Sequence, residues 1–81
     1  MVTQLEKNRF VLCINNSGNE ASLEKWKVYQ YLPDKEAEMH REIRVIDEEG
    51  EDYLYPSDYF SYVILEPSVA EIFLMERSTK A

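Results

Sequence analysis

The sequence predicts a mainly β fold, a small five-strand barrel followed by a short C-terminal α-helix. The chain has 81 residues, which is room for one domain and no second core. Its aromatic fraction of 12% favours strands over helices, and short apolar runs alternate with clusters of turn-forming residues. We expect the domain to cover residues 9–76, with flexible ends at residues 1–8 and 77–81.

Two strands are predicted in the N-terminal part of the chain. Residues 9–14 (RFVLCI) are mostly apolar, and the turn-forming cluster after them predicts a loop over residues 15–25. Residues 26–32 (WKVYQYL) alternate with the period of two that is typical of a half-buried strand. Pro33 ends this strand because proline has no backbone N–H to donate.

A hairpin is predicted in the middle of the chain. Residues 34–40 contain good helix formers but are too few for a stable isolated helix, so we expect one helical turn within a loop. The strands predicted at residues 41–47 and 52–55 flank Gly50, which can take the positive φ of a tight turn. These two strands are therefore expected to pair antiparallel.

A proline turn, a fifth strand and a helix complete the predicted fold. Residues 56–58 (PSD) interrupt the strands as one turn of 3₁₀ helix, and residues 60–65 (FSYVIL) resume as a strand. Ser68 and Glu71 have the spacing of a capping box, which predicts a helix over residues 69–76. A helix this short must dock to be stable, and its apolar residues at i, i+3 and i+4 are the expected docking face: Val69, Ile72 and Phe73.

One segment places a proline turn directly before the last predicted strand. It is Tyr55–Val63 (YPSDYFSYV), and it resembles the Pro-Ser-Asn-Tyr-Val signature that closes domains of the Src-homology-three family. Leu23, followed by Lys27–Tyr29 (KVY), is similar to the start of that family's second strand after its long first loop. The resemblance implies a five-strand Src-homology-three-like barrel, with ligand contacts at Pro56 and Tyr59.

A second resemblance concerns the predicted hairpin. The run Arg44–Pro56 (RVIDEEGEDYLYP) is similar to one found in small uncharacterised bacterial proteins. It implies a bacterial origin and the same fold, and no particular activity. Residues 41–44, at the start of the third predicted strand, lack the Trp that proline-peptide-binding members of the Src-homology-three family carry there.

The charge balance argues against nucleic-acid and membrane partners. Sixteen Asp and Glu residues against nine Lys and Arg residues give a formal net charge of −7. Nucleic-acid and anionic-lipid binding both depend on clustered Lys and Arg, whereas the basic residues here are scattered along the chain. We therefore expect a basic or neutral protein or peptide as the partner.

The sequence contains no pattern that predicts catalysis, a metal site or a cofactor. Cys13, the one cysteine, lies in an apolar strand and is expected to be buried and unreactive. His40, the one histidine, is expected at the surface. The acidic run Asp47–Asp52 lacks the glycine position of a calcium loop and is expected to be a solvated turn. With no export signal, we expect a cytoplasmic protein that is not an enzyme.

The aromatic residues give the positive indication of function. A barrel this small encloses roughly ten to fifteen side chains, which leaves some of the six tyrosines for the surface. Exposed Tyr and Trp are typical binding anchors, although they can also simply cover the outer wall of a barrel. We predict a protein-interaction surface, rimmed by acidic residues, that contains Trp26, Tyr55, Pro56 and Tyr59.

Other functions fit the same sequence. The chain could be a homo-oligomeric structural protein in which the helix at residues 69–76 docks onto a second subunit. It could also bind a small ligand, carry an undetected activity, or act as an acidic inhibitor that imitates nucleic acid and occupies a DNA-binding partner.

Overall fold

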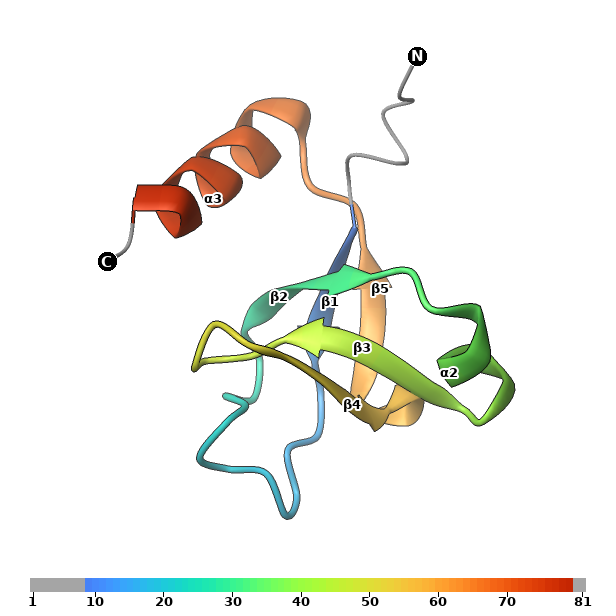
Figure 1. Ribbon diagram of the computed structural model, residues 1–81. Helices are drawn as coiled ribbons and strands as arrows, with labels where there is room; N and C mark the ends of the chain where they lie inside the picture. Colours follow the sequence, from blue (N-terminus) through green and yellow to red (C-terminus); the bar gives the residue numbers. More distant parts are fainter. Residues whose placement is uncertain (1–8, 80–81) are drawn as a thin grey trace.

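The computed structural model describes residues 9–79. Five antiparallel strands form one sheet in the order β4–β3–β2–β1–β5, with three short helices between and after them (Figure 1). The elements in chain order are β1 (Phe10–Cys13), β2 (Val28–Leu32), α2 (Lys35–Met39), β3 (Glu42–Ile46), β4 (Asp52–Pro56), η1 (Ser57–Tyr59), β5 (Phe60–Val63) and α3 (Pro67–Thr79). The prediction of a mainly β domain with a C-terminal helix is therefore confirmed.

Strand β2 joins the two halves of the sheet. Its first part pairs with β1, where Tyr29 lies opposite Val11, and its last part pairs with β3, where Tyr31 lies opposite Val45. The strands on the two sides of β2 therefore run across one another, as Figure 1 shows for β1 and β3. Because β4 and β5 stand at the two ends of the strand order, the sheet is open.

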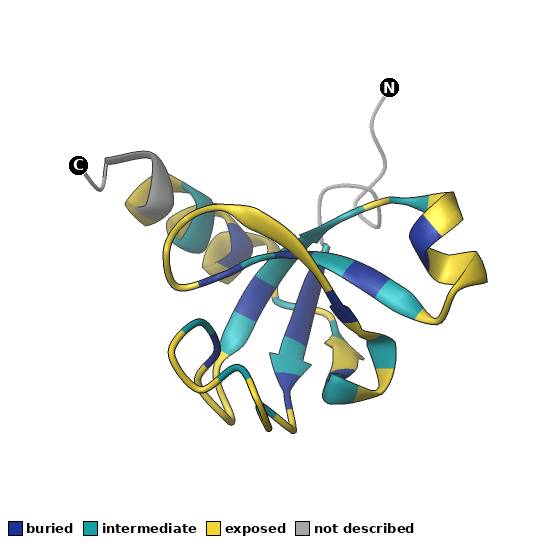
Figure 2. Ribbon diagram, turned by 60° about the horizontal axis from the view of Figure 1, so that its bottom comes forward, coloured by how far each residue is buried: buried dark blue, intermediate teal, exposed yellow. Residues whose placement is uncertain are grey.

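The core lies on the concave side of this curved sheet. On β3, Ile43 and Val45 are buried while the residues between and beside them are partly exposed, which is the alternation of a half-buried strand. Figure 2 shows buried segments along the central strands, whereas most of β4, the connections and the outer sides of the helices are exposed. The central cluster consists of Val11, Cys13, Leu23, Tyr29, Ile43, Val45, Tyr55 and Phe60.

The local predictions around α2 and the hairpin are confirmed. The Asp34 side chain caps α2 by accepting a hydrogen bond from the Ala37 amide at 3.0 Å. The same carboxylate contacts the Arg44 guanidinium on β3 at 2.9 Å, which ties α2 to the sheet. Gly50 has a φ of +79° in the turn between β3 and β4.

The second strand begins later than predicted. The strand was expected from residue 26, but β2 starts at Val28, and Trp26 has a φ of +70°. The Trp26 N–H donates to the Cys13 carbonyl at 2.6 Å, and the Cys13 N–H donates to the Lys27 carbonyl at 2.9 Å. These bonds hold the chain against the end of β1 in a left-handed conformation that side chains rarely adopt.

The C-terminal helix is longer than predicted, and its cap differs. Helix α3 begins at Pro67, a residue that is favoured at the first helical position. The Ala70 N–H donates to the Glu66 carbonyl at 2.9 Å, so Ser68 lies inside the first turn and is not the cap. Residues 77–79, predicted as a flexible tail, continue the helix, while residues 1–8 and 80–81 lie outside the described part of the chain.

Helix α3 docks through a different face from the predicted one. The Phe73 ring packs edge-to-face against Phe10 on β1, with 5.0 Å between the ring centroids, and Ala70 is buried. Val69 and Ile72 are 48% and 55% exposed, so two of the three predicted docking residues face solvent. None of the helices within residues 9–79 has the length and apolar character that a membrane crossing requires.

Candidate functional site

Tyr55, one of the four residues predicted to form the interaction surface, lies in the core. It is 5% exposed, and its hydroxyl donates to the buried Asp47 carboxylate at 2.8 Å. Tyr55 stands opposite Ile43 in the hairpin, and directly paired residues share one face of a sheet. The prediction that Tyr55 is a surface anchor is therefore wrong, because its face of β4 is the one turned to the core.

Trp26 and Tyr59 flank the end of β1. The Trp26 backbone bonds to Cys13 on one side, and the Tyr59 carbonyl accepts hydrogen bonds from Ile14 at 2.8 Å and Asn15 at 3.2 Å on the other. The Trp26 side chain is 67% exposed, and Tyr59 is partly buried against the core. The structure thus places both residues beside the same short segment.

The neighbouring loop is fastened to the tyrosine of η1. The Tyr59 hydroxyl donates to the Ser17 carbonyl at 2.7 Å, which links η1 to the loop between β1 and β2. Pro56 precedes η1, is exposed, and lies opposite Glu42 on β3. We use the name Trp26 surface for the three predicted anchors that are not fully buried: Trp26, Pro56 and Tyr59.

The rim of the Trp26 surface carries both signs of charge. The Lys25 ammonium lies 5.8 Å from the centroid of the Trp26 ring, within the range of a cation–π contact. Glu24 is also exposed, and its carboxylate is 3.9 Å from the Lys27 ammonium. The rim therefore contains a basic group beside the acidic residues that were predicted.

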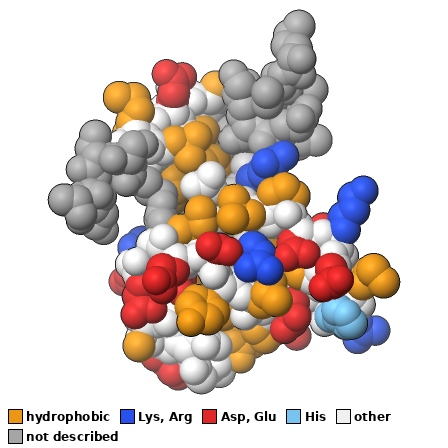
Figure 3. All heavy atoms as spheres, in the orientation of Figure 1, with side chains coloured by type: hydrophobic (Ala, Val, Ile, Leu, Met, Phe, Trp, Pro, Cys, Tyr) orange, Lys and Arg blue, Asp and Glu red, His pale blue; other side chains and the backbone are white. Residues whose placement is uncertain are grey.

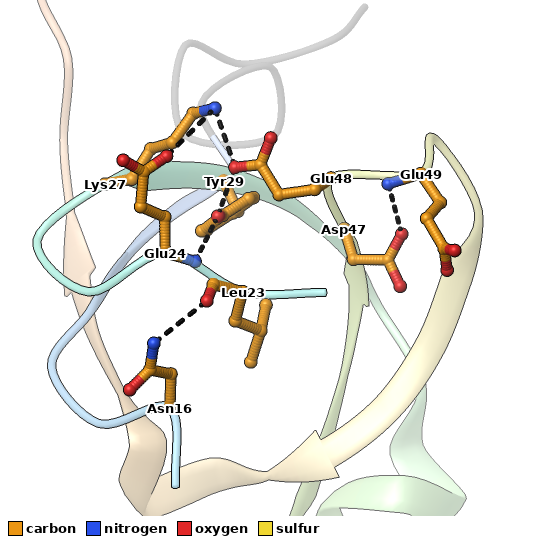
Figure 4. Close-up of polar contacts among 8 residues, drawn as sticks. All are labelled: Asn16, Leu23, Glu24, Lys27, Tyr29, Asp47, Glu48 and Glu49. Carbon is orange, nitrogen blue, oxygen red and sulfur yellow. Dashed lines mark hydrogen bonds and ion pairs between the residues drawn. The ribbon is translucent and has the colours of Figure 1, made fainter. Parts of the chain in front are cut away.

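A polar cluster holds the loop that carries Trp26 against the hairpin (Figure 4). The Tyr29 hydroxyl accepts a hydrogen bond from the Glu24 amide at 2.7 Å and donates one to the Glu48 carboxylate. The Lys27 ammonium is 2.6 Å from the same carboxylate. Burial, and next the hydrogen bond to Glu48, raise the pKa of Tyr29, so its hydroxyl stays protonated and keeps donating. We call Glu24, Lys27, Tyr29 and Glu48 the Tyr29 cluster.

Asp47 begins the turn of the hairpin and is buried, although the acidic run was predicted to be a solvated turn. Its carboxylate accepts from the Glu49 amide at 2.9 Å as well as from Tyr55, and its carbonyl accepts from the Gly50 amide at 2.9 Å. The Glu48 amide donates to the Ser22 carbonyl at 3.0 Å. Asp47 therefore organises the turn, and the rest of the run is exposed.

A cleft of about 320 Å³ lies where α3 meets the sheet. Apolar side chains gather over the sheet beside α3 on the face in Figure 3, with acidic and basic side chains interspersed below them. Phe73 and Glu76 of α3 line one part of the cleft. The other lining residues come from β2 and the hairpin: Lys27, Val28, Tyr29, Asp47 and Glu48. Three members of the Tyr29 cluster, Lys27, Tyr29 and Glu48, thus also line the cleft, and their mutual contacts limit the freedom of its charged groups.

The residues with reactive side chains lie apart from these surfaces. Cys13 is fully buried, as predicted, and burial raises the pKa of its thiol, which keeps it protonated at neutral pH. His40 follows α2 and is exposed, as predicted. Within residues 9–79, no group of three or more His, Cys, Asp or Glu side chains is placed to hold a metal ion.

Sequence reasoning missed the Tyr29 cluster. Tyr29 and Glu48 are separated by 19 positions, and nothing in the local pattern of either segment links them. The one signal that could have drawn attention to Tyr29 is its place on the apolar side of an alternating strand. No protein-family model, curated protein or solved structure matches this chain.

Proposed function

We propose that this chain is a non-catalytic protein-interaction domain, built on an open barrel of the Src-homology-three type, that binds a protein segment at the Trp26 surface. Five antiparallel strands and the 3₁₀ turn between β4 and β5 support the fold assignment. The family resemblance gives ligand contacts to Pro56, which directly precedes η1, and to Tyr59, which is the last residue of η1. Tyr55 has no part in the proposed surface.

The exposure of Trp26 in a left-handed backbone conformation is the observation that carries the proposal. A bulky residue with a φ of +70° costs about 1–3 kcal/mol. Burial of the Trp26 side chain offsets little of this conformational cost, since 67% of the side chain is exposed. Glycine would adopt the same backbone without strain. Stability alone therefore favours glycine at this position, whereas a binding role explains a Trp held out to solvent.

The surroundings of Trp26 hold its backbone in place. Its amide is bonded to Cys13 in the core, and the residues on both sides of it belong to a fastened segment. Glu24 and Lys27, two and one positions away, are members of the Tyr29 cluster. An anchor whose backbone is already ordered loses less conformational entropy on binding, which favours affinity.

Trp26→Gly is the variant that tests this proposal. It removes the aromatic side chain and also relieves the positive φ, so the free energy of unfolding should stay equal or rise. We expect binding to fall by tenfold or more, the usual effect of truncating an aromatic anchor. The measurement is the affinity of wild type and variant for a panel of synthetic extended peptides with basic, neutral and acidic sequences.

Tyr53→Ala is the matched control, because Tyr53 is 57% exposed on β4 and lies outside the Trp26 surface. Its binding should equal that of wild type. Equal affinity of Trp26→Gly and wild type for every peptide that binds would refute the surface. Failure of all the peptides to bind wild type would remove the support for an interaction domain of this kind.

Homo-oligomerisation is a second candidate, favoured by the outer face of α3. Val69, Ile72 and Met75 follow one another at intervals of three and are 48%, 55% and 61% exposed. Such a stripe is a suitable surface for another helix. Light scattering of wild type and Ile72→Glu distinguishes this function, since only an oligomer built on α3 would dissociate in the variant.

A further inference from the structure

Among residues 9–79, which the structure describes, strand β5 has one side without a neighbouring strand, because it stands at an end of the sheet order. The opposite side pairs with β1, and the Ile14 N–H donates to the Tyr59 carbonyl just before the strand begins. Antiparallel ladders alternate from such a bond. Ser61 and Val63 therefore direct their backbone groups to β1, while Tyr62 directs its N–H and C=O to the open side.

The side chains of β5 leave this edge unprotected. Residues 60–65 contain no charged residue and no proline, the two features that natural proteins use most to prevent strand addition. Tyr62 is 65% exposed and Ile64 is 74% exposed. The Tyr62 ring packs edge-to-face on Tyr31 of β2, with 5.3 Å between the centroids, so it is held in place while one face stays open. Within the described part of the chain, the edge thus combines backbone groups that no strand pairs with two exposed apolar side chains.

Acidic side chains stand at both ends of this edge. Asp58 precedes β5 and Glu66 follows it, and both are exposed. The pKa of Tyr62 is raised, first by burial, then by Tyr31 and third by the carboxylate of Glu38 on α2. Glu38 therefore lies near enough to Tyr62 to add negative charge to this edge. The electrostatic environment of the edge is thus favourable to positive charge.

The same charges disfavour a second copy of this chain as the occupant. An antiparallel pairing of two β5 strands centred on Tyr62 places Asp58 of each copy opposite Glu66 of the other. Like charges directly opposite each other destabilise a strand pair, and this clash occurs at both ends. The net charge of −7 on each chain adds to the repulsion.

We propose that the open edge of β5 accepts an extended basic segment of a partner protein as an additional strand. The backbone of Tyr62 pairs with the segment, apolar residues of the segment contact Tyr62 and Ile64, and flanking Lys or Arg residues face Asp58 and Glu66. This inference rests on the proposed function of an interaction domain, but it concerns a different set of residues from the Trp26 surface.

The test uses synthetic peptides of about nine residues with an alternating Val-Thr core, a length that matches an ordinary strand. One peptide has Lys at both ends, the second has Glu there, and the third repeats the first with N-methyl groups along one edge. We expect the Lys-flanked peptide to bind at least tenfold more tightly than the other two. Its binding should shift the backbone amide resonances of Tyr62 and Ile64.

Two variants locate the site. Tyr62→Pro removes the amide that points to the open side and leaves the bonds to β1, so it should fold and lose about tenfold or more in affinity. Tyr62→Lys keeps the backbone and repels the basic peptide, and it provides the same test if the proline variant does not fold. Leu54→Lys, at an exposed position on β4, is the matched control and should bind as wild type does.

Several results would overturn the inference. These are equal binding of the Lys- and Glu-flanked peptides, unchanged binding by folded Tyr62 variants, or amide shifts confined to residues away from β5. A wild-type dimer that protects the β5 amides from exchange would identify a second copy as the occupant and also refute it. If Trp26→Gly abolishes binding of the peptide panel while the Tyr62 variants have no effect, the interaction domain stands and the β5 site does not.

Discussion

The Tyr55 hydroxyl donates a 2.8 Å hydrogen bond to the Asp47 carboxylate, and both side chains are buried. This bond crosses the hairpin, from the first residue of its turn to the inner face of β4. A buried carboxylate is tolerated only when its oxygens have donors. Here Tyr55 satisfies one oxygen and the Glu49 amide satisfies the other, so the turn and the core are held by the same acid.

Removing the Tyr55 hydroxyl should therefore reduce the stability of the fold, although the change deletes only one oxygen atom. Tyr55→Phe leaves one oxygen of Asp47 without its donor, and we expect the free energy of unfolding to fall by about 1.5–3 kcal/mol, the usual value for a hydrogen bond to a charged group. Urea unfolding monitored by circular dichroism measures it. Tyr53→Phe, at the exposed tyrosine two positions earlier, is the control and should change stability by less than about 0.5 kcal/mol. Equal effects of the two variants would contradict the importance of the bond.

The same pair predicts sensitivity to alkaline pH. Burial, followed by the hydrogen bond to Asp47, raises the pKa of Tyr55 from 10.0 to about 12. A raised pKa means that the folded state holds the proton more tightly than the unfolded state does. Its contribution to stability is therefore complete below pH 10 and is lost as the pH rises through about 12. Urea titrations between these limits should show a smaller pH dependence in Tyr55→Phe than in wild type. An identical dependence would show that other groups control alkaline unfolding.

Acid should weaken the cap of α2. The Ala37 amide, and then the Arg44 guanidinium, lower the pKa of Asp34 from its ordinary value of 3.8. The stability that follows from this shift is present above the ordinary value and is lost as the pH falls through the lower folded value. Asp34→Asn keeps a capping oxygen but cannot titrate, so its stability should depend less on pH in this range. Carbon NMR of the Asp34 carboxyl group measures the pKa directly, and an unshifted value would refute the prediction.

The docking of α3 can be tested with two neighbouring residues. Phe73→Ala removes the ring that packs on Phe10 and should reduce stability by about 2 kcal/mol, less than the 3–5 kcal/mol of a fully buried Phe, because Phe73 is only partly buried. Ile72→Ala changes a 55% exposed side chain and should have a much smaller effect on the monomer. Thermal unfolding and amide exchange along α3 provide the measurements. A larger effect from Ile72 than from Phe73 would mean that the helix docks through its other face.

The sequence was informative wherever structure depends on neighbours along the chain. Gly50 between two alternating runs predicts the hairpin, and the chain does reverse there. The conformation of Trp26 was not predictable, because it depends on a bond to Cys13, thirteen positions earlier. The burial of Tyr55 likewise depends on which face of the hairpin meets β1 and β5. The alternating pattern does not decide which face this is, because tyrosines lie on one face and other apolar residues lie on both.

Helix α3 illustrates a related limit. Apolar residues occur on several sides of it, so the spacing of Val69, Ile72 and Phe73 identified a possible face but not the one that is used. The face that docks is determined by the position of Phe10 on β1, because the Phe73 ring packs against the Phe10 ring. Only the three-dimensional arrangement contains this information.

The place of β1 in the sheet has a consequence for synthesis of the chain. Strand β1 is translated before the other strands within residues 9–79 and is bonded on one side to β5, the last of them, with Cys13 opposite Phe60 and Phe10 opposite Val63. Local pairing can form the hairpin early, but β1 keeps an unsatisfied edge until β5 has been translated. A nascent chain that stalls before residue 60 would expose that edge, with buried-type residues such as Val11 beside it, to other nascent chains. Rapid completion of translation, or a chaperone that covers β1, would then determine the yield of folded protein.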